Sequence, residues 1–213
     1  MSMLARLTGG GGEAERAADG FPRGLAFGRV TDNQDPENLG RVRVRLELHS
    51  DDQASFWARI ATLMAGPEIG AWFLPEIDDE VLVGFIGEDP SHPVVLGGVW
   101  NSQQPPPETN SDGNNDRRLI RSRSHHELRF DDGDANEIEL TMKDGSRIYL
   151  TDGHAVIEDR QGNKVEIKDG NVTVEATQKL TLKGANVVLE ATSQVEIKAG
   201  TTCKIQGTMV EIN

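Results

Sequence analysis

Apolar and polar residues alternate along most of the chain, and glycine, asparagine, aspartate and proline interrupt the alternation at short intervals. A period of two residues is typical of strands that bury one face, and the interrupting residues are typical of turns. The pattern therefore predicts an all-β protein built from short strands.

Residues 21–101 contain the first group of predicted strands. The runs are LAFGRVT, GRVRVRLEL, FWARIAT, AWFLPEIDDEVLVGFI and PVVLGGVW, and turn-forming residues separate them. About five or six strands in a stretch of this length are typical of a small closed barrel. We therefore expect residues 21–101 to form one small barrel domain.

Two segments flank this predicted barrel. Residues 1–20 hold a glycine tetrad among alanines and charged residues, which predicts a flexible arm with at most a short helix. Residues 102–118 are rich in proline and asparagine and nearly free of apolar side chains, which predicts a linker. The linker marks a domain boundary, and residues 119–213 form a second β region.

The second region repeats with a period of about eight residues. Apolar pairs two positions apart begin at intervals of 7, 8, 7, 8, 8 and 7 residues between Val165 and Val210. Such a repeat leaves only about 3 to 5 strand residues per unit, too few for a free-standing sheet with two covered faces. Each unit must therefore stack on another.

Two arrangements satisfy this requirement. A single chain can wind into a β-solenoid, whose turns usually need roughly 18 residues or more, or three chains can wind together into a triangular prism. In the prism, strands pair with neighbouring chains and apolar side chains meet on the axis, an intertwined trimeric β-helix. The predicted trimer-core residues are Val165, Ile167, Val172, Val174, Leu180, Leu182, Val187, Leu189, Val195, Ile197, Cys203, Ile205, Val210 and Ile212.

Composition favours the stacked arrangement and excludes several classes of function. Only 36% of residues are hydrophobic and 23 are glycine, which is poor material for a thick core. The net charge of −13 argues against binding to nucleic acid or anionic lipid. A single cysteine permits no intrachain disulfide, and the apolar runs are far shorter than a membrane span. We expect synthesis in the cytoplasm without a signal peptide.

Several separated motifs resemble one known family. GRVTDNQDPENLGRVRVRL, FWARIATLMAG and WFLPEIDDEVLVGFIGEDPSHPVVLGGVWN are similar to the oligonucleotide/oligosaccharide-binding (OB) barrel of contractile-tail spikes, in the order that the family has them. This family includes phage baseplate assembly protein V and the spike part of the valine-glycine repeat proteins of type VI secretion. RSRSHHELRFDD resembles the family's entry into its β-helix, and the later repeat resembles its needle.

The resemblance implies a homotrimeric spike of a phage tail, tailocin or related injection particle, which attaches to a hub protein and pierces a target envelope mechanically. It implies no enzyme activity, no cofactor and no metal site. Spikes of this kind commonly bind a conical tip protein of the proline-alanine-alanine-arginine (PAAR) repeat type. The residues expected to dock such a tip are Gly207, Thr208, Met209, Val210, Glu211, Ile212 and Asn213.

The chain also departs from parts of the family pattern. Residues 1–20 leave no room for the large hub module of type VI spikes, so we expect the hub to be a separate protein. The short linker excludes the lysozyme domain that some phage spikes insert. The last histidine is His154, so the terminal His-X-His iron site of some short spikes is absent.

Two groups of side chains, a basic cluster and a histidine pair, are candidates for a specific role. Arg117, Arg118, Arg121 and Arg123 form the one basic cluster, for which we expect salt bridges between chains at the neck of the spike. His125 and His126 are adjacent, and neighbouring residues on a strand point to opposite faces, so we expect a structural role and not metal binding.

Two rival functions remain. An OB domain that binds a glycan or single-stranded nucleic acid on a β stalk predicts an aromatic and basic groove. Phe56, Trp57, Trp72 and Phe73 supply aromatic rings, but the neighbouring segments are acidic. An envelope-degrading enzyme of the same tail predicts hydrolysis of cell wall, yet no catalytic constellation stands out from the turns.

Overall fold

The computed structural model describes residues 24–47, 55–89 and 91–212, and the chain divides into two units after Thr109. The predicted arm at residues 1–20 lies outside the described residues. Every regular element of the described chain is a strand except η1 (Ile86–Glu88), a single 3-10 turn, which confirms the all-β prediction. No helix among these residues has the length and apolar character needed to span a membrane.

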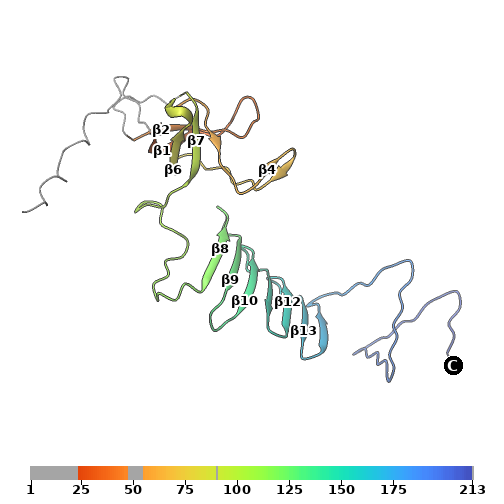
Figure 1. Ribbon diagram of the computed structural model, residues 1–213. Helices are drawn as coiled ribbons and strands as arrows, with labels where there is room; N and C mark the ends of the chain where they lie inside the picture. The colour runs from red at the N-terminus through yellow and green to blue at the C-terminus, as the bar shows by residue number, and fades with distance from the viewer. Residues whose placement is uncertain (1–23, 48–54, 90, 213) are drawn as a thin grey trace, which may run out of the picture. The chain divides into compact units, whose positions relative to one another are not determined.

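The first unit is a curled five-stranded sheet (Figure 1). Its strands, in the spatial order β2-β1-β6-β7-β3, are β2 (Arg43–Leu46), β1 (Leu25–Asp32), β6 (Glu80–Phe85), β7 (Pro93–Gly98) and β3 (Arg59–Ile60). Neighbours run antiparallel except β3 and β7, which are parallel. Val42 and Ala58 exchange two backbone hydrogen bonds of 3.0 and 2.7 Å next to the edge strands β2 and β3. This bridge curls the sheet into the predicted small barrel.

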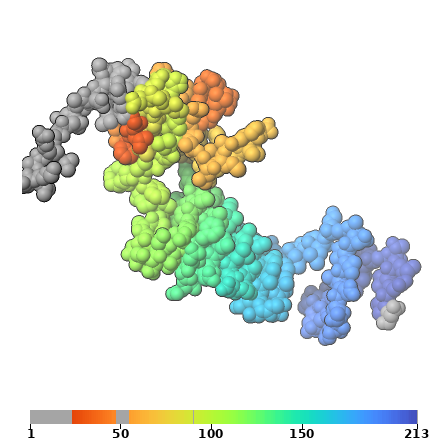
Figure 2. Space-filling model, in the orientation of Figure 1, coloured from red at the N-terminus to blue at the C-terminus, as the bar shows by residue number. Residues whose placement is uncertain are grey.

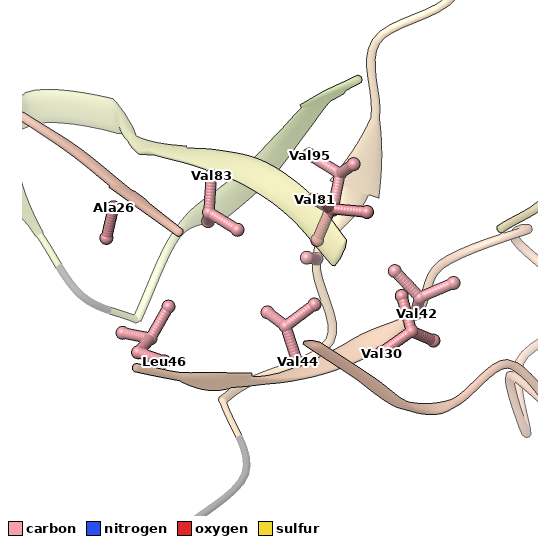
Figure 3. Packing of buried hydrophobic residues seen from close by; sticks show 9 residues of the cluster. Ala26, Val30, Val42, Val44, Leu46, Val81, Val83 and Val95 are labelled. Carbon is pink, nitrogen blue, oxygen red and sulfur yellow. The ribbon is translucent and has the colours of Figure 1, made fainter. Parts of the chain in front are cut away.

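Small branched side chains fill the centre of this barrel. Val30, Val44, Val81, Val83 and Val95 are completely buried, and Figure 3 shows them gathered inside the barrel from the four strands β1, β2, β6 and β7. Each alternates along its strand with an exposed or half-buried neighbour, as a period of two requires. β-branched valines suit this setting because their χ1 rotamers are restricted even before folding.

A hairpin that the sequence pattern did not reveal follows β3. It consists of β4 (Ala65–Gly66) and β5 (Ile69–Gly70), joined through Pro67 and Glu68, and it projects from the first unit (Figures 1 and 2). Gly70 adopts a φ of 157°, and a Cβ atom there would lie 2.6 Å from the carbonyl oxygen of Met64. Glycine is therefore required where the hairpin returns to the barrel.

The second unit is a seven-stranded antiparallel sheet whose strands follow one another in chain order (Figure 1). They are β8 (Arg117–Arg121), β9 (Glu127–Asp131), β10 (Glu137–Thr141), β11 (Arg147–Thr151), β12 (His154–Glu158), β13 (Lys164–Lys168) and β14 (Asn171–Glu175). The first begins two residues before the position predicted for this region. At the turn between β13 and β14, Asp169 and Gly170 both have positive φ, the geometry of a tight primed hairpin turn.

This arrangement corrects the predicted pairing scheme. Between residues 117 and 175 each strand pairs with the preceding strand of the same chain, and not with a neighbouring chain. The tight turns explain the difference, because they fold each strand directly back on the one before it.

Residues 176–212 contain no strand, although the apolar repeat continues through them. All of these residues are exposed, so the predicted strands at Leu180, Val187, Val195, Cys203 and Val210 are not seen in the single chain. A strand needs a partner backbone for its N–H and C=O groups, and the isolated chain supplies none to these residues.

The barrel core yields a first prediction. Val83→Ala removes two buried methyl groups and should lower the free energy of unfolding of the first unit by about 2 kcal/mol. Tryptophan fluorescence during denaturant unfolding reports this unit alone, since all three tryptophans precede residue 110. Leu63→Ala, at a side chain that is 97% exposed, is the matched control and should leave the midpoint unchanged.

Candidate assembly surfaces

The two faces of the seven-stranded sheet differ sharply in chemistry. The strand register aligns Ile138 with Leu150 and Leu140 with Ile148, and the same alignment continues across all seven strands. One face is therefore apolar except for Arg118 at its start. Its members are Ile120, Leu128, Phe130, Ile138, Leu140, Ile148, Leu150, Ala155, Ile157, Val165, Ile167, Val172 and Val174.

This apolar face is open to water in the single chain. Ile148 is 41% exposed and Val174 is 50% exposed. The first four predicted trimer-core residues lie on this face, in β13 and β14: Val165, Ile167, Val172 and Val174. A contiguous apolar surface across seven strands exceeds the scattered apolar residues that a monomer normally exposes. It is therefore a candidate surface for association.

The opposite face carries ion pairs that cross the strands. Arg129 on β9 lies 2.6 Å from Glu137 and 2.7 Å from Glu139, both on β10. On β13, Lys164 lies 2.9 Å from Glu166, whose other oxygen lies 2.7 Å from His154 Nε2 on β12. Lys164 first, and then His154, lower the pKa of Glu166 through these hydrogen bonds. Opposite charges on facing strands favour this register, and they keep this face in water.

The predicted neck arginines make their ion pairs within one chain. Arg117 lies 3.2 Å from Asp131, Arg118 lies 2.5 Å from Asp132, and Arg121 bonds to Glu127. Within the single chain these contacts join β8 to β9 and the residue after it, and salt bridges between chains stay a prediction. Arg123 is exposed in the turn that follows β8.

His125 and His126 lie in the turn between β8 and β9, not on a strand as we expected. His125 has a φ of 63°, and the backbone N–H of His126 donates to Ser122 Oγ at 3.1 Å. His126 Nδ1 accepts a hydrogen bond of 3.3 Å from the backbone N–H of Lys143. Among the described residues, no three histidine, cysteine, aspartate or glutamate side chains are grouped so that they could hold a metal ion.

The residues predicted to dock a tip, as far as they are described, lie in the exposed segment that follows β14. Met209 is 77% exposed and Ile212 is 88% exposed, and the last predicted position, Asn213, lies outside the described residues. The Cys203 thiol is likewise free and exposed. The single chain brings none of the predicted core positions after Val174 together.

One long loop of the barrel is held by a single carboxylate. Asp35 accepts backbone hydrogen bonds from Glu37, Leu39 and Arg41, at 3.1, 2.9 and 3.2 Å. The Arg41 guanidinium adds two bonds of 2.9 and 2.7 Å, and the Asp35 side chain is only 3% exposed. These contacts, the Arg41 side chain above all, hold the pKa of Asp35 well below its usual range.

A groove opens beside the projecting hairpin of the first unit. It has a volume of about 1250 Å³, and its lining includes the exposed Leu63, Trp72 and Phe73. Sequence reasoning noted these two aromatic rings but not the groove, because the groove depends on the hairpin that the pattern missed.

The barrel and its loops match a known protein family. The model of the type VI secretion system/phage-baseplate injector OB domain matches residues 26–100, which covers the whole sheet of the first unit. Residues 26–100 are thus similar to the OB domain that type VI secretion and phage-baseplate injectors share. The resemblance inferred from the separated motifs is thereby confirmed.

Relatives with curated names are spike proteins. Type VI secretion system spike protein VgrG4b of Pseudomonas aeruginosa is 34% identical over 111 residues, which make up 47% of this chain and 14% of that protein. Spike protein VgrG3 of Vibrio cholerae is 28% identical over 136 residues, or 59% of this chain and 13% of that protein. The actin cross-linking toxin VgrG1 of Vibrio cholerae is 28% identical over 144 residues, 64% of this chain and 12% of the toxin. The chain thus spans only a small part of these relatives.

The Asp35 loop predicts a specific acid response. Because the native carboxylate keeps a lowered pKa, the unfolded state binds the proton first as pH falls, and the stability from this contact is lost below about pH 4. Asp35→Asn should destabilise the barrel at pH 7 and flatten the acid dependence that remains. Tryptophan fluorescence in denaturant at several pH values measures both effects.

Glu37→Gln is the control for the Asp35 experiment. Glu37 also faces Arg41, at 3.2 Å, but its side chain is exposed. This variant should keep the wild-type acid slope. An equal flattening in both variants would show that the loop responds to net charge, and not to the Asp35 contacts.

Proposed function

We propose that the chain is the homotrimeric central spike of a contractile injection particle, such as a phage tail, a tailocin or a type VI secretion apparatus. The observation that carries the proposal is the continuous apolar face of β8–β14, in a chain whose other unit is an injector OB domain. Under this proposal the barrel is the collar, and the second unit with its C-terminal extension is the needle.

Assembly of three copies covers the apolar sheet face that is exposed in the single chain. Three sheets that turn their apolar faces toward one axis enclose a triangular core, while the ion-paired faces remain in water. The apolar repeat of residues 176–212 gains backbone partners in the same way when three such segments wind around each other. Intertwining is therefore proposed for these later residues, after a part in which each chain forms its own sheet.

The proposed work of the spike is mechanical. A rod closed on all sides by hydrogen-bonded strands resists bending, and it transmits the force of a contracting tail to an envelope without any bond chemistry in the chain. The relative named as an actin cross-linking toxin matches this chain over 144 residues, which are 12% of the toxin. We propose no catalytic role for the present chain.

Two protein partners follow from a spike. The barrel end requires a hub protein that anchors the spike in the particle. Residues 207–213 are proposed to bind a PAAR-type tip, since the apolar side chains of Met209 and Ile212 are exposed and a bound tip would cover them. The assembled particle, and not a membrane, is then the site where the protein resides.

A binding module for glycans or single-stranded nucleic acid receives less support. The best candidate ring, Trp57, already has the guanidinium groups of Arg43 and Arg41 over it, at 5.0 and 5.9 Å from its centre. A base or sugar would have to displace these arginines before it could stack on the ring. The net charge of −13 further opposes a polyanion.

Two neighbouring residues of β14 provide the test of three-chain assembly. Val174 lies on the apolar face and Thr173 on the opposite face, and both are exposed in the single chain. Val174→Glu should lower the fraction of three-chain species, because it places three charges where about 1 to 2 kcal/mol of apolar burial per chain is expected. Light scattering of purified wild type should give about three times 23.2 kDa.

Thr173→Glu adds the same charge to the same strand and should keep the three-chain mass. Circular dichroism of both variants checks that the strands still form. A single-chain mass for the wild-type protein, or an equal effect of the two substitutions, would contradict association through the apolar face.

The tip proposal has a separate test. Removing residues 207–213 should abolish co-purification with the particle's own PAAR-type protein while leaving the three-chain mass intact, since the apolar sheet face precedes the deletion. Retention of the tip by the shortened chain would place the docking surface elsewhere. Gln104→Ala, at a residue of the first unit, is the control and should bind the tip like wild type.

A further inference from the structure

The groove beside the projecting hairpin is apolar and almost free of charge. One side is formed by the hairpin arm, residues 61–75, which read ATLMAGPEIGAWFLP and hold Glu68 as their only charged residue. Trp72 and Phe73 of the arm are 71% and 66% exposed, and the groove holds about 1250 Å³. Apolar area in water costs free energy, and a groove of this volume has room for several side chains. It is therefore suited to an apolar segment of chain.

An apolar strip on the outside of the barrel leads from the start of β1 to this groove. Leu25 of β1 and Leu96 of β7 are 59% and 45% exposed. A Cβ atom on Gly84 of β6, which lies between them, would be 3.4 Å from Leu25 Cδ2 and 3.5 Å from Leu96 Cδ1. The two leucines are therefore close neighbours, and Leu96 lines the groove. The described chain thus begins, at Gly24, next to a residue of the groove wall.

One stretch outside the described residues has chemistry that matches the groove. Residues 1–7 read MSMLARL, with Arg6 as the only charged side chain. Residues 13–19, after the glycine tetrad, read EAERAAD and are rich in charge, and residues 48–54 read LHSDDQA and are acidic. Residues 1–7 alone among these stretches offer a run of methionine and leucine, the kind of side chain that an apolar groove accepts.

We propose that residues 1–7 return to the barrel and fill the groove of their own chain, so that the N-terminal segment covers the hairpin arm. The reach is sufficient, because residues 8–23 can span up to about 55 Å and end at Gly24 beside the groove wall. A segment on a tether of this length has an effective concentration on the order of millimolar, so a weak apolar contact is enough to seat it.

The proposed contact would act as a cover built into the chain. It would keep the apolar arm out of water while the barrel is free, and any protein that used the same groove would have to displace residues 1–7 first. The contact lies within one chain, so it does not depend on how many copies the particle contains.

A photo-crosslinker in the N-terminal segment tests this contact. Leu4 is replaced by p-benzoylphenylalanine in the full chain, and Ala17, in the charged stretch, is replaced in the control. After irradiation, position 4 should link to peptides of residues 61–75 in the same chain, so the product keeps the single-chain mass on denaturing gels. Mass spectrometry after proteolysis should find these linked peptides several-fold more often from position 4 than from position 17.

Two further measurements use the groove itself. Phe73→Glu should reduce crosslinking from position 4, whereas Phe56→Glu, at a side chain that is 59% exposed but does not line the groove, should leave it unchanged. Removing residues 2–7 should raise the rate of backbone hydrogen exchange in residues 61–75 several-fold, because their cover is lost.

The outcomes that would overturn the inference are distinct. Equal linking from positions 4 and 17 would show that the groove does not select residues 1–7. Links from position 4 that double the mass on denaturing gels would place the segment on another copy. Unchanged hydrogen exchange in residues 61–75 after the deletion would show that the segment does not cover the arm. A single-chain mass for the wild type before irradiation would contradict the three-chain spike and leave this contact standing.

Discussion

The separation of apolar and charged side chains onto opposite faces of one sheet governs the second half of this molecule. Alternation along each strand creates the two faces, and the register between strands keeps them aligned over β8–β14. A slip of one residue in any hairpin would mix the faces. The contacts that cross strands, those of Arg129 with Glu137 and of His154 with Glu166, therefore matter mainly for register, since partly exposed pairs contribute little free energy each.

The first unit buries its core side chains within a single chain. It closes its sheet into a barrel and fills the centre with valines, so it needs no partner to hide its core. Its exposed apolar residues lie instead outside this core, above all on the hairpin arm. The two units thus contain a self-sufficient fold followed by an incomplete one, which is the order expected where a stable collar carries a needle made from several chains.

Alternation and turn residues predicted most of the fold from sequence. They located β1, β2, β6 and β7 and the paired apolar positions of β13 and β14. They missed β4 and β5, because glycine and proline there give no alternation to read. They also assigned strands after Val174, since a sequence pattern records which residues can form a strand but not whether a partner is present. Nor does the spacing of Arg117 and Arg118 reveal which carboxylates they contact in the single chain, namely those of Asp131 and Asp132.

The tight turn at Asp169 and Gly170 is the last of a series of local connections, and these connections determine the order of events during folding. Each strand of β8–β14 finds its partner a few residues back along the same chain, so the sheet forms through short loops at little entropic cost and without waiting for another molecule. In the proposed three-chain assembly, copies meet as preformed sheets of equal length. Their alignment along the axis is then decided by these rigid sheets, and residues 176–212 have only to continue a registration that already exists.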